Sequence, residues 1–259
     1  MLDAGPETQC HDAHPTDSPP VLAKPAAGRS LLTARARPPT IEPGPDCERG
    51  WPPEDADKCA DVRLSEGRPT VGQVVDDEVL DASPGDRARA AADALGDDEL
   101  TAWCTDLIAG RVAWGDPATP DIGWVGGRAA RGWGSPERLD DSTGYWARVW
   151  AARTLLYVWD DACTADVVAG LGDPAWRVKE MCAKVCARWE VGAAADASAA
   201  LVDDEVPRVR AAAVRVLGVA GEGEHVDPVR AALADPDGSV RTAAGRALRA
   251  LRQRLDRPL

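Results

Sequence analysis

The chain of 259 residues contains no phenylalanine and no asparagine, and it has only three isoleucines and four lysines against 26 arginines. These scarce residues have AT-rich codons, so the bias indicates a high-GC bacterial genome, and the preference for arginine carries no structural information. No apolar run approaches the roughly 18 residues of a transmembrane helix, and no basic stretch followed by an apolar one marks a signal peptide. We therefore expect a cytoplasmic protein without membrane association, whose seven cysteines are reduced thiols.

The net charge of −13 is unevenly distributed along the chain. Residues 1–83 hold 16 acidic and 8 basic side chains, whereas residues 145–259 hold 16 of each. The acidic front part argues against non-specific nucleic-acid binding by the whole chain, because phosphate attraction needs an electropositive surface. The neutral back part leaves room for a local basic face.

Residues 1–83 are acidic and rich in proline, as in "PTDSPP", "IEPGPD" and "WPPEDA". Without a sustained apolar period such a segment buries too little surface to offset its ordering entropy, so we expect a disordered tail. A second interpretation is that the gene start is assigned too far upstream, since valines that an alternative start could encode stand at Val71, Val74, Val75 and Val79.

Residues 84–138 predict a helical region ahead of the remainder. "SPGDRARAAADALG" has Ser83 as an N-cap, Pro84 at the first helical position and Gly96 as a stop. "DDELTAWCTDLIAG" follows as a second helix, with an apolar face of Leu100, Trp103, Leu107 and Ile108. The Gly-, Pro- and Trp-rich stretch after it is expected to be a loop with one short irregular helix.

From residue 139 the chain repeats itself. The segments "LDDSTGYWAR", "LGDPAWRVK", "LVDDEVPRVR" and "LADPDGSVR" share a leucine, a following aspartate and an apolar–basic pair, and successive pairs lie 31 residues apart. Further columns keep the same period: Arg153, Lys184, Arg215 and Arg246; Ala151, Cys182, Ala213 and Ala244; and Leu155, Cys186, Leu217 and Leu248. Several columns in phase indicate a repeated structural unit.

The repeated unit is predicted to be a helix pair. Second helices are expected near 145–159, 175–189, 206–219 and 238–254, and first helices near 162–171, 193–202 and 224–233. In each second helix the columns of residues 147, 151, 154, 155 and 158 form one apolar stripe, which should pack on the partner helix and on neighbouring repeats. The fold class is therefore all-α, a right-handed α-solenoid of stacked antiparallel helix pairs.

The pattern L-x-D-x-x-x-x-V-R, followed by an Ala-rich helix with a basic residue five positions later, resembles the HEAT-repeat family over residues 139–259. More narrowly, it is similar to the short HEAT-like repeats first described in phycobilisome lyases. The stretches "YWARVWAARTLLYVWDDA" and "DPAWRVKEMCAKV" resemble small actinobacterial HEAT-repeat proteins without an assigned activity. The resemblance implies a non-catalytic scaffold that binds a protein partner.

One face of the helix 145–159 is the candidate partner site. Trp146, Trp150, Arg153 and Tyr157 follow helical spacing, and their columns are mostly polar or small in later repeats, which places them off the common apolar stripe. Lys184 and Arg215 extend this face along the array, and tryptophan and arginine are frequent interface anchors. The alternative is that Trp146, Trp150 and Trp159 pack against residues 84–138 and close the end of the solenoid.

A second basic column has a structural explanation. Each of its members follows an acidic loop, so that contacts between aspartate and cation could fix the stacking of neighbouring repeats; they are Arg148, Lys179, Arg210 and Arg241. The functional alternative is a row of phosphate contacts. Cys182 and Cys186 share columns with Ala and Leu, so they are expected to be buried thiols, and "CHDAH" at residues 10–14 holds too few ligands for a metal site. No cofactor is expected.

Two further functions remain open. A HEAT-fold DNA-binding protein or alkylpurine DNA glycosylase-like enzyme would use Trp146, Trp150, Asp160 and Asp161 as its aromatic and acidic groups, although the neutral charge of residues 145–259 disfavours nucleic acid. A bilin lyase-like tetrapyrrole binder rests on the resemblance of the repeats alone. The identity of the protein partner and the oligomeric state do not follow from the sequence.

Overall fold

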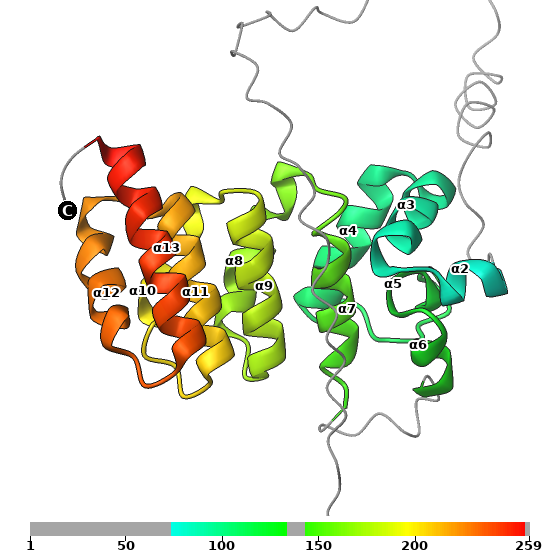
Figure 1. The fold of residues 1–259 in the computed structure, drawn as a ribbon. Coiled ribbons are helices and arrows are strands. Elements are labelled where there is room, and N and C mark those ends of the chain that lie inside the picture. The colour runs from blue at the N-terminus through cyan, green and yellow to red at the C-terminus, as the bar shows by residue number, and fades with distance from the viewer. Residues whose placement is uncertain (1–73, 134–142, 257–259) are drawn as a thin grey trace, which may run out of the picture. The chain divides into compact units, whose positions relative to one another are not determined.

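The computed structural model describes residues 74–133 and 143–256, and within these ranges the chain forms helices and turns and no strand (Figure 1). The expectations for residues 1–73, including the disordered tail and the "CHDAH" motif, lie outside the described residues. The described residues begin at residue 74, ahead of Ser83, the position at which we expected order to start. Helix α2 spans Asp77–Asp81, and both Val75 and Leu80 are buried.

The two helices predicted before the repeats are present with their capping residues. Helix α3 spans Pro84–Leu95 and α4 spans Asp97–Ile108. The Ser83 hydroxyl accepts a hydrogen bond from the Asp86 backbone N–H at 3.2 Å, and Gly96 between the helices has a φ of 87°, which favours glycine. The four apolar residues predicted on one face of α4 are all buried. Two short helices follow instead of one, α5 (Gly123–Gly126) and α6 (Arg128–Trp133).

The second helices of the repeat are α7 (Trp146–Thr154), α9 (Trp176–Arg188), α11 (Pro207–Ala220) and α13 (Gly238–Leu255). The last three agree with the predicted bounds to within a residue or two. Helix α7 ends earlier than expected, because Leu156 and Tyr157 donate to the carbonyl oxygens of Arg153 and Thr154 and so tighten the chain into a turn.

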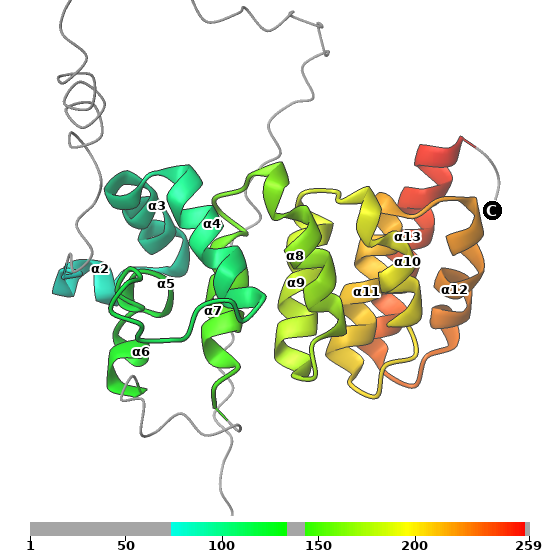
Figure 2. The same ribbon diagram turned by 180° about the vertical axis from the view of Figure 1, so that it is seen from behind.

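Each first helix is a short α-helix that begins with a 3₁₀ turn. The first contains η3 (Asp161–Cys163), α8 (Thr164–Ala169) and η4 (Gly170–Gly172); the second contains η5 (Gly192–Ala194) and α10 (Ala195–Ala200); the third contains η6 (Gly223–His225), α12 (Val226–Ala231) and η7 (Ala232–Ala234). Helices α9, α11 and α13 lie side by side in one layer, and α8, α10 and α12 form the layer behind them (Figures 1 and 2).

The apolar stripe predicted for the second helices is the core of the stack. In α7 and the turn after it, Ala147, Ala151, Thr154, Leu155 and Val158 are all buried. The N-terminal helices α2 to α5 share one hydrophobic cluster with α7 to α9, so they cover the first repeat. Helices α11 and α13 approach closely at Gly218, where an added Cβ would lie 2.7 Å from the Cα of Ala247.

The thiols of Cys182 and Cys186 are buried within this core, as the sequence predicted. Burial raises the pKa of the Cys186 thiol to about 12, and it also raises the pKa of Cys182. Both side chains are therefore neutral apolar packing groups at neutral pH.

Candidate functional site

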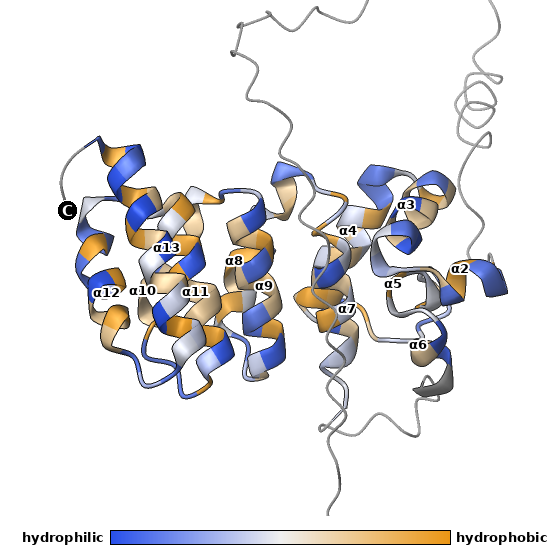
Figure 3. Ribbon diagram, in the orientation of Figure 1, coloured by the Kyte–Doolittle hydropathy of each residue, from blue (hydrophilic) through white to orange (hydrophobic). Residues whose placement is uncertain are grey.

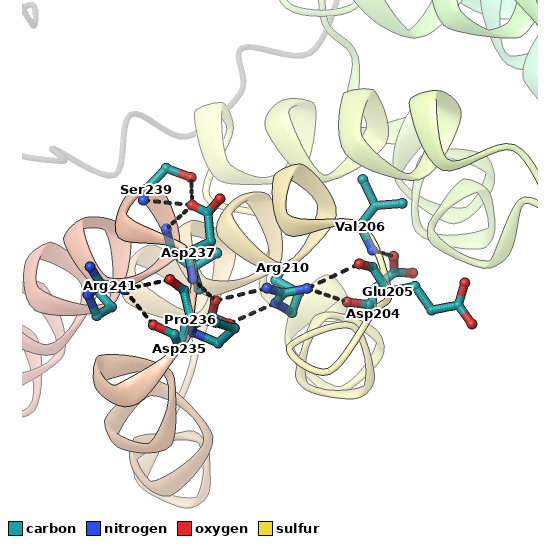
Figure 4. A network of polar contacts seen from close by, with 10 residues as sticks. Asp204, Glu205, Val206, Arg210, Asp235, Pro236, Asp237, Ser239 and Arg241 are labelled. Carbon is teal, nitrogen blue, oxygen red and sulfur yellow. Dashed lines mark hydrogen bonds and ion pairs between the residues drawn. The ribbon is translucent and has the colours of Figure 1, made fainter.

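A ladder of ion pairs joins each second helix to the loop before the next one. Arg148 donates through Nε and Nη2 to the Asp173 carboxylate at 2.7 and 3.2 Å, and Lys179 Nζ donates to Asp204. Arg210 donates to Asp235 at 2.7 and 2.8 Å (Figure 4). The partners are separated by 25 residues in every case, so one cation of each repeat contacts the next repeat.

The same aspartates also organise their own loops. Asp173, Asp204 and Asp235 each accept a hydrogen bond from the backbone N–H two residues later, at 2.7 to 2.8 Å. Arg241 differs from the other cations, because it donates to the carbonyl oxygens of Asp235 and Pro236 within its own repeat (Figure 4). Asp140 and Asp141, the acidic pair expected before Arg148, lie outside the described residues. All four basic side chains of this column make hydrogen bonds within the chain; three of them are partly buried, and Arg241 is exposed.

Trp150 is not part of an accessible surface, which corrects its assignment to the predicted partner face. Only 5% of the residue is exposed. Its ring meets Trp114 edge-on at 5.0 Å between ring centroids, and an added Cβ on Gly126 would lie 2.6 Å from it. Tyr157 packs in the same way, because an added Cβ on Gly85 of α3 would lie 2.8 Å from its ring. This side of α7 therefore contacts the N-terminal helices.

Trp159 lies at the next junction. Its ring stacks on Trp189 at 5.9 Å, and its indole N–H donates to Asp161 at 3.2 Å. The Trp189 indole N–H in turn donates to the Leu155 carbonyl oxygen at 2.8 Å. These two tryptophans connect the end of α7 to the end of α9.

Trp146 belongs to a surface row of rings and cations that crosses three repeats. We call it the aromatic–cation row; its members are Tyr145, Trp146, Trp176, Arg177 and Arg208. Tyr145 stacks on Trp146 at 5.3 Å. The Arg177 guanidinium lies 5.3 Å from the Trp146 ring and 4.3 Å from the Trp176 ring, and Arg208 lies 5.7 Å from Trp176. All five side chains are partly or fully exposed.

Arg177 and Arg208 lie 31 and 62 residues after Trp146 and so share its column, whereas Trp176 was not among the predicted site residues. The signal was present, because Tyr145 and Trp176 are 31 residues apart and so occupy one column, directly before the column of Trp146 and Arg177. An aromatic ring thus begins both second helices at the same place.

The predicted extension of the partner face runs along the second helices beside this row. Lys184 pairs with Glu180 at 2.8 Å, and Arg208 Nε donates to the same carboxylate at 3.1 Å. Arg215 is exposed and makes no hydrogen bond or ion pair with any described residue. Arg153, the equivalent residue of α7, lies half-buried at the contact with α3 rather than on this surface.

Charge separates between the two layers of helices. The four second helices carry 14 basic residues and one acidic residue, Glu180. The first-helix segments 161–172, 192–200 and 223–234 carry five acidic residues and one basic residue. Hydrophilic positions recur along α9, α11 and α13 between the apolar ones (Figure 3). The net charge of zero for residues 145–259 is therefore the sum of a basic helix layer, an acidic helix layer and acidic loops.

In the cleft that the described residues form beside Asp160, the other residues of the DNA glycosylase-like alternative are absent from the lining. Asp160 lines a cleft of about 380 Å³ with Asp98, Thr101, Ala102, Thr105, Ala162 and Cys163, and neither Trp146 nor Trp150 lines it. Asp160 also accepts from the Ala162 N–H at 2.7 Å, which caps the turn η3. These contacts give the aspartate a structural role at the start of the first helix.

The stacked helix pairs form a helical solenoid, and comparison with known families names its repeats. Residues 194–258, which contain the last two helix pairs, match the family model of HEAT repeats. Residues 194–258 are thus similar to HEAT repeats. A search of curated proteins gave no match. Across residues 74–133 and 143–256, none of the helices combines the length and apolar character needed to cross a bilayer.

Proposed function

We propose that this protein is a non-catalytic cytoplasmic scaffold that binds a protein partner through the exposed side of its second helices. We call this surface the second-helix face; it comprises Trp146, Trp176, Arg177, Lys184, Arg208, Arg215 and Arg246. The observation that carries the proposal is the separation of charge between the helix layers, which leaves these cations together beside partly exposed aromatic rings.

The geometry of the face supports this function. Arg177 and Lys184 are seven residues apart on α9, as are Arg208 and Arg215 on α11, so both pairs point to one side of their helices. Tryptophan and arginine contribute most to interface energetics, because they combine large apolar area with directed hydrogen bonds. We also propose a right-handed superhelix, in which residues 139–259 form the repeats and residues 84–138 cover their first helix.

A protein partner fits this face better than a nucleic acid. The chain carries a net charge of −13, and Glu180 lies among the cations of the face, where it contacts both Lys184 and Arg208. Three cations that could have contacted phosphates are bound to aspartates inside the stack. A face of this kind suits a partner surface with acidic and aromatic groups.

Site-specific photocrosslinking in the native host tests the proposal. A photoreactive amino acid at Arg215 of the second-helix face should give a discrete protein adduct, whereas the same group at Asp227 of α12 should not. The variant R208E should weaken the Arg215 adduct, and R230E on α12 is the matched charge-reversal control, because Arg230 is also exposed but lies in the first-helix layer. Equal adducts from both layers, or an adduct that nuclease treatment removes, would contradict the proposal.

A further inference from the structure

Two arginines lie at the contact between α3 and α7 without an acidic partner. Arg87 is 6% exposed, and its Nη1 donates to the carbonyl oxygens of Ala82 at 2.8 Å and Leu80 at 3.5 Å. Arg153 is half-buried and makes no hydrogen bond or ion pair with any described residue. The Nε atoms of both side chains are buried and have no hydrogen-bond acceptor.

This arrangement differs from that of the cations which pair with carboxylates along the second helices. Arg148, Lys179 and Arg210 each contact an aspartate, and Lys184, the equivalent of Arg153 one repeat later, contacts Glu180. A buried cation without a counter-charge is unfavourable, and a second cation beside it adds repulsion. Burial, and then repulsion from Arg87, lower the pKa of the Arg153 guanidinium.

Two neighbouring groups add to the positive potential here. Tyr157 lies one helical turn after Arg153, and its ring packs against Gly85 in the first turn of α3. The N-terminal end of α3, which carries the positive end of the helix dipole, is therefore beside the Tyr157 ring. Asp86, the acidic residue of that turn, is exposed and already contacts Ser83 and Arg89.

We propose that Arg87, Arg153 and Tyr157 form a binding site for a phosphate-type oxyanion, either inorganic phosphate or the phosphate of a small monoester. Guanidinium groups bind such oxygens in pairs, and the unsatisfied Nε–H groups would supply directed donors together with the phenolic hydroxyl. Arg153 is partly exposed, whereas its Nε and the Arg87 side chain are buried, so a ligand would reach these donors through a movement of the Arg153 side chain. This inference does not rest on the proposed protein partner, because the site lies at the α3–α7 contact and not on the second-helix face.

The test is thermal unfolding of the full chain in phosphate-free buffer, with phosphate added at constant ionic strength. We expect inorganic phosphate to raise the Tm of the wild type by several degrees once the phosphate concentration is about 100 times the Kd of the site. The variant R153Q should lose this response, and without phosphate its Tm should equal or exceed that of the wild type, because an unpaired buried charge has been removed. The variant R215Q, at the equivalent exposed position of α11, should respond as the wild type does.

Further arms separate the sources of the anion. O-phosphoserine in place of phosphate tests whether the site admits a monoester, and acetate tests whether any carboxylate suffices. A response to phosphate and not to acetate supports the proposal. The proposal is overturned if R153Q responds to phosphate as the wild type does, if the wild type shows no response up to about 50 mM phosphate, roughly 50 times a millimolar Kd, or if R153Q alone is strongly destabilised in the absence of phosphate.

Discussion

Removal of Asp235 should destabilise the protein more than removal of any exposed helix cap. Asp235 accepts two hydrogen bonds from Arg210 at 2.7 and 2.8 Å and one from the Asp237 N–H at 2.8 Å. The side chains of Arg210 and Asp235 are 12% and 8% exposed, so solvent screens their interaction weakly. The substitution D235A thus removes a charge-assisted pair and a loop contact together.

The magnitude follows from these contacts. Breaking a buried pair by removing one partner costs about 3–5 kcal/mol. Arg210 retains acceptors, however, because its Nη1 also donates to the Asp204 and Glu205 carbonyl oxygens, so the lower end applies. We expect D235A to lower the free energy of unfolding by about 3 kcal/mol, a Tm decrease of roughly 6–12 °C for a domain of this size. The control D237A, which removes an exposed N-cap of α13, should cost about 1 kcal/mol.

A double-mutant cycle with R210M and D235N isolates the pair, because asparagine keeps the acceptor for the loop N–H. Urea unfolding of the four proteins should give a coupling free energy above about 1 kcal/mol. A coupling below about 0.5 kcal/mol, or a D235A variant no less stable than D237A, would refute the view that these contacts hold neighbouring repeats in register.

Four other outcomes follow from the same structure. Hydrogen bonding from Arg210 lowers the pKa of Asp235, so the stability that the pair contributes is full above the unfolded value near 4 and is lost as the pH falls below it; acid titration should therefore destabilise the wild type more than R210M. W150A should cost about 3–5 kcal/mol, because it removes a buried ring, whereas W146A, at a partly exposed ring, should cost less; chemical unfolding compares them. G218A should destabilise by about 1–3 kcal/mol through contact with Ala247, while G172A, with nothing near its added Cβ, should be close to neutral in the same assay. The thiols of Cys104, Cys163, Cys182 and Cys186 are buried and should react with a thiol reagent only on unfolding, as mass spectrometry of labelled peptides would show.

The repeat period explains why so much of the array could be predicted. A column in which the same type of residue recurs in all four repeats predicts both the start of each second helix and its buried stripe. The bounds of α9, α11 and α13 were therefore predicted to within a residue or two. Helix α7 was predicted too long, because the turn at Leu156 and Tyr157 replaces a helical end that the later repeats retain. Nothing in the period signalled that difference.

The surface of α7 could not be predicted for a related reason. Comparison of the repeat columns indicated that Trp150 and Tyr157 lie off the common apolar stripe. That position is equally consistent with packing against other helices of the chain and with contact to a partner protein. The cover consists of α3, α5 and the loop around Trp114, which lie outside the repeat, so no period related them to α7. Only the fold brings Gly126 under Trp150 and Gly85 under Tyr157.

The two basic columns of the second helices differ in the hydrogen bonds and ion pairs that their side chains make. The column of Arg148, Lys179 and Arg210 is tied to stacking, because each aspartate 25 residues later accepts from the cation and also organises its own loop. Both contacts recur at the same interval of 31 residues as the columns of the repeat. The outer column imposes no such restraint, since Arg215 and Arg246 contact no described residue through a hydrogen bond or ion pair. Stacking therefore does not require cations at those positions, whereas the protein partner that we propose for the second-helix face would.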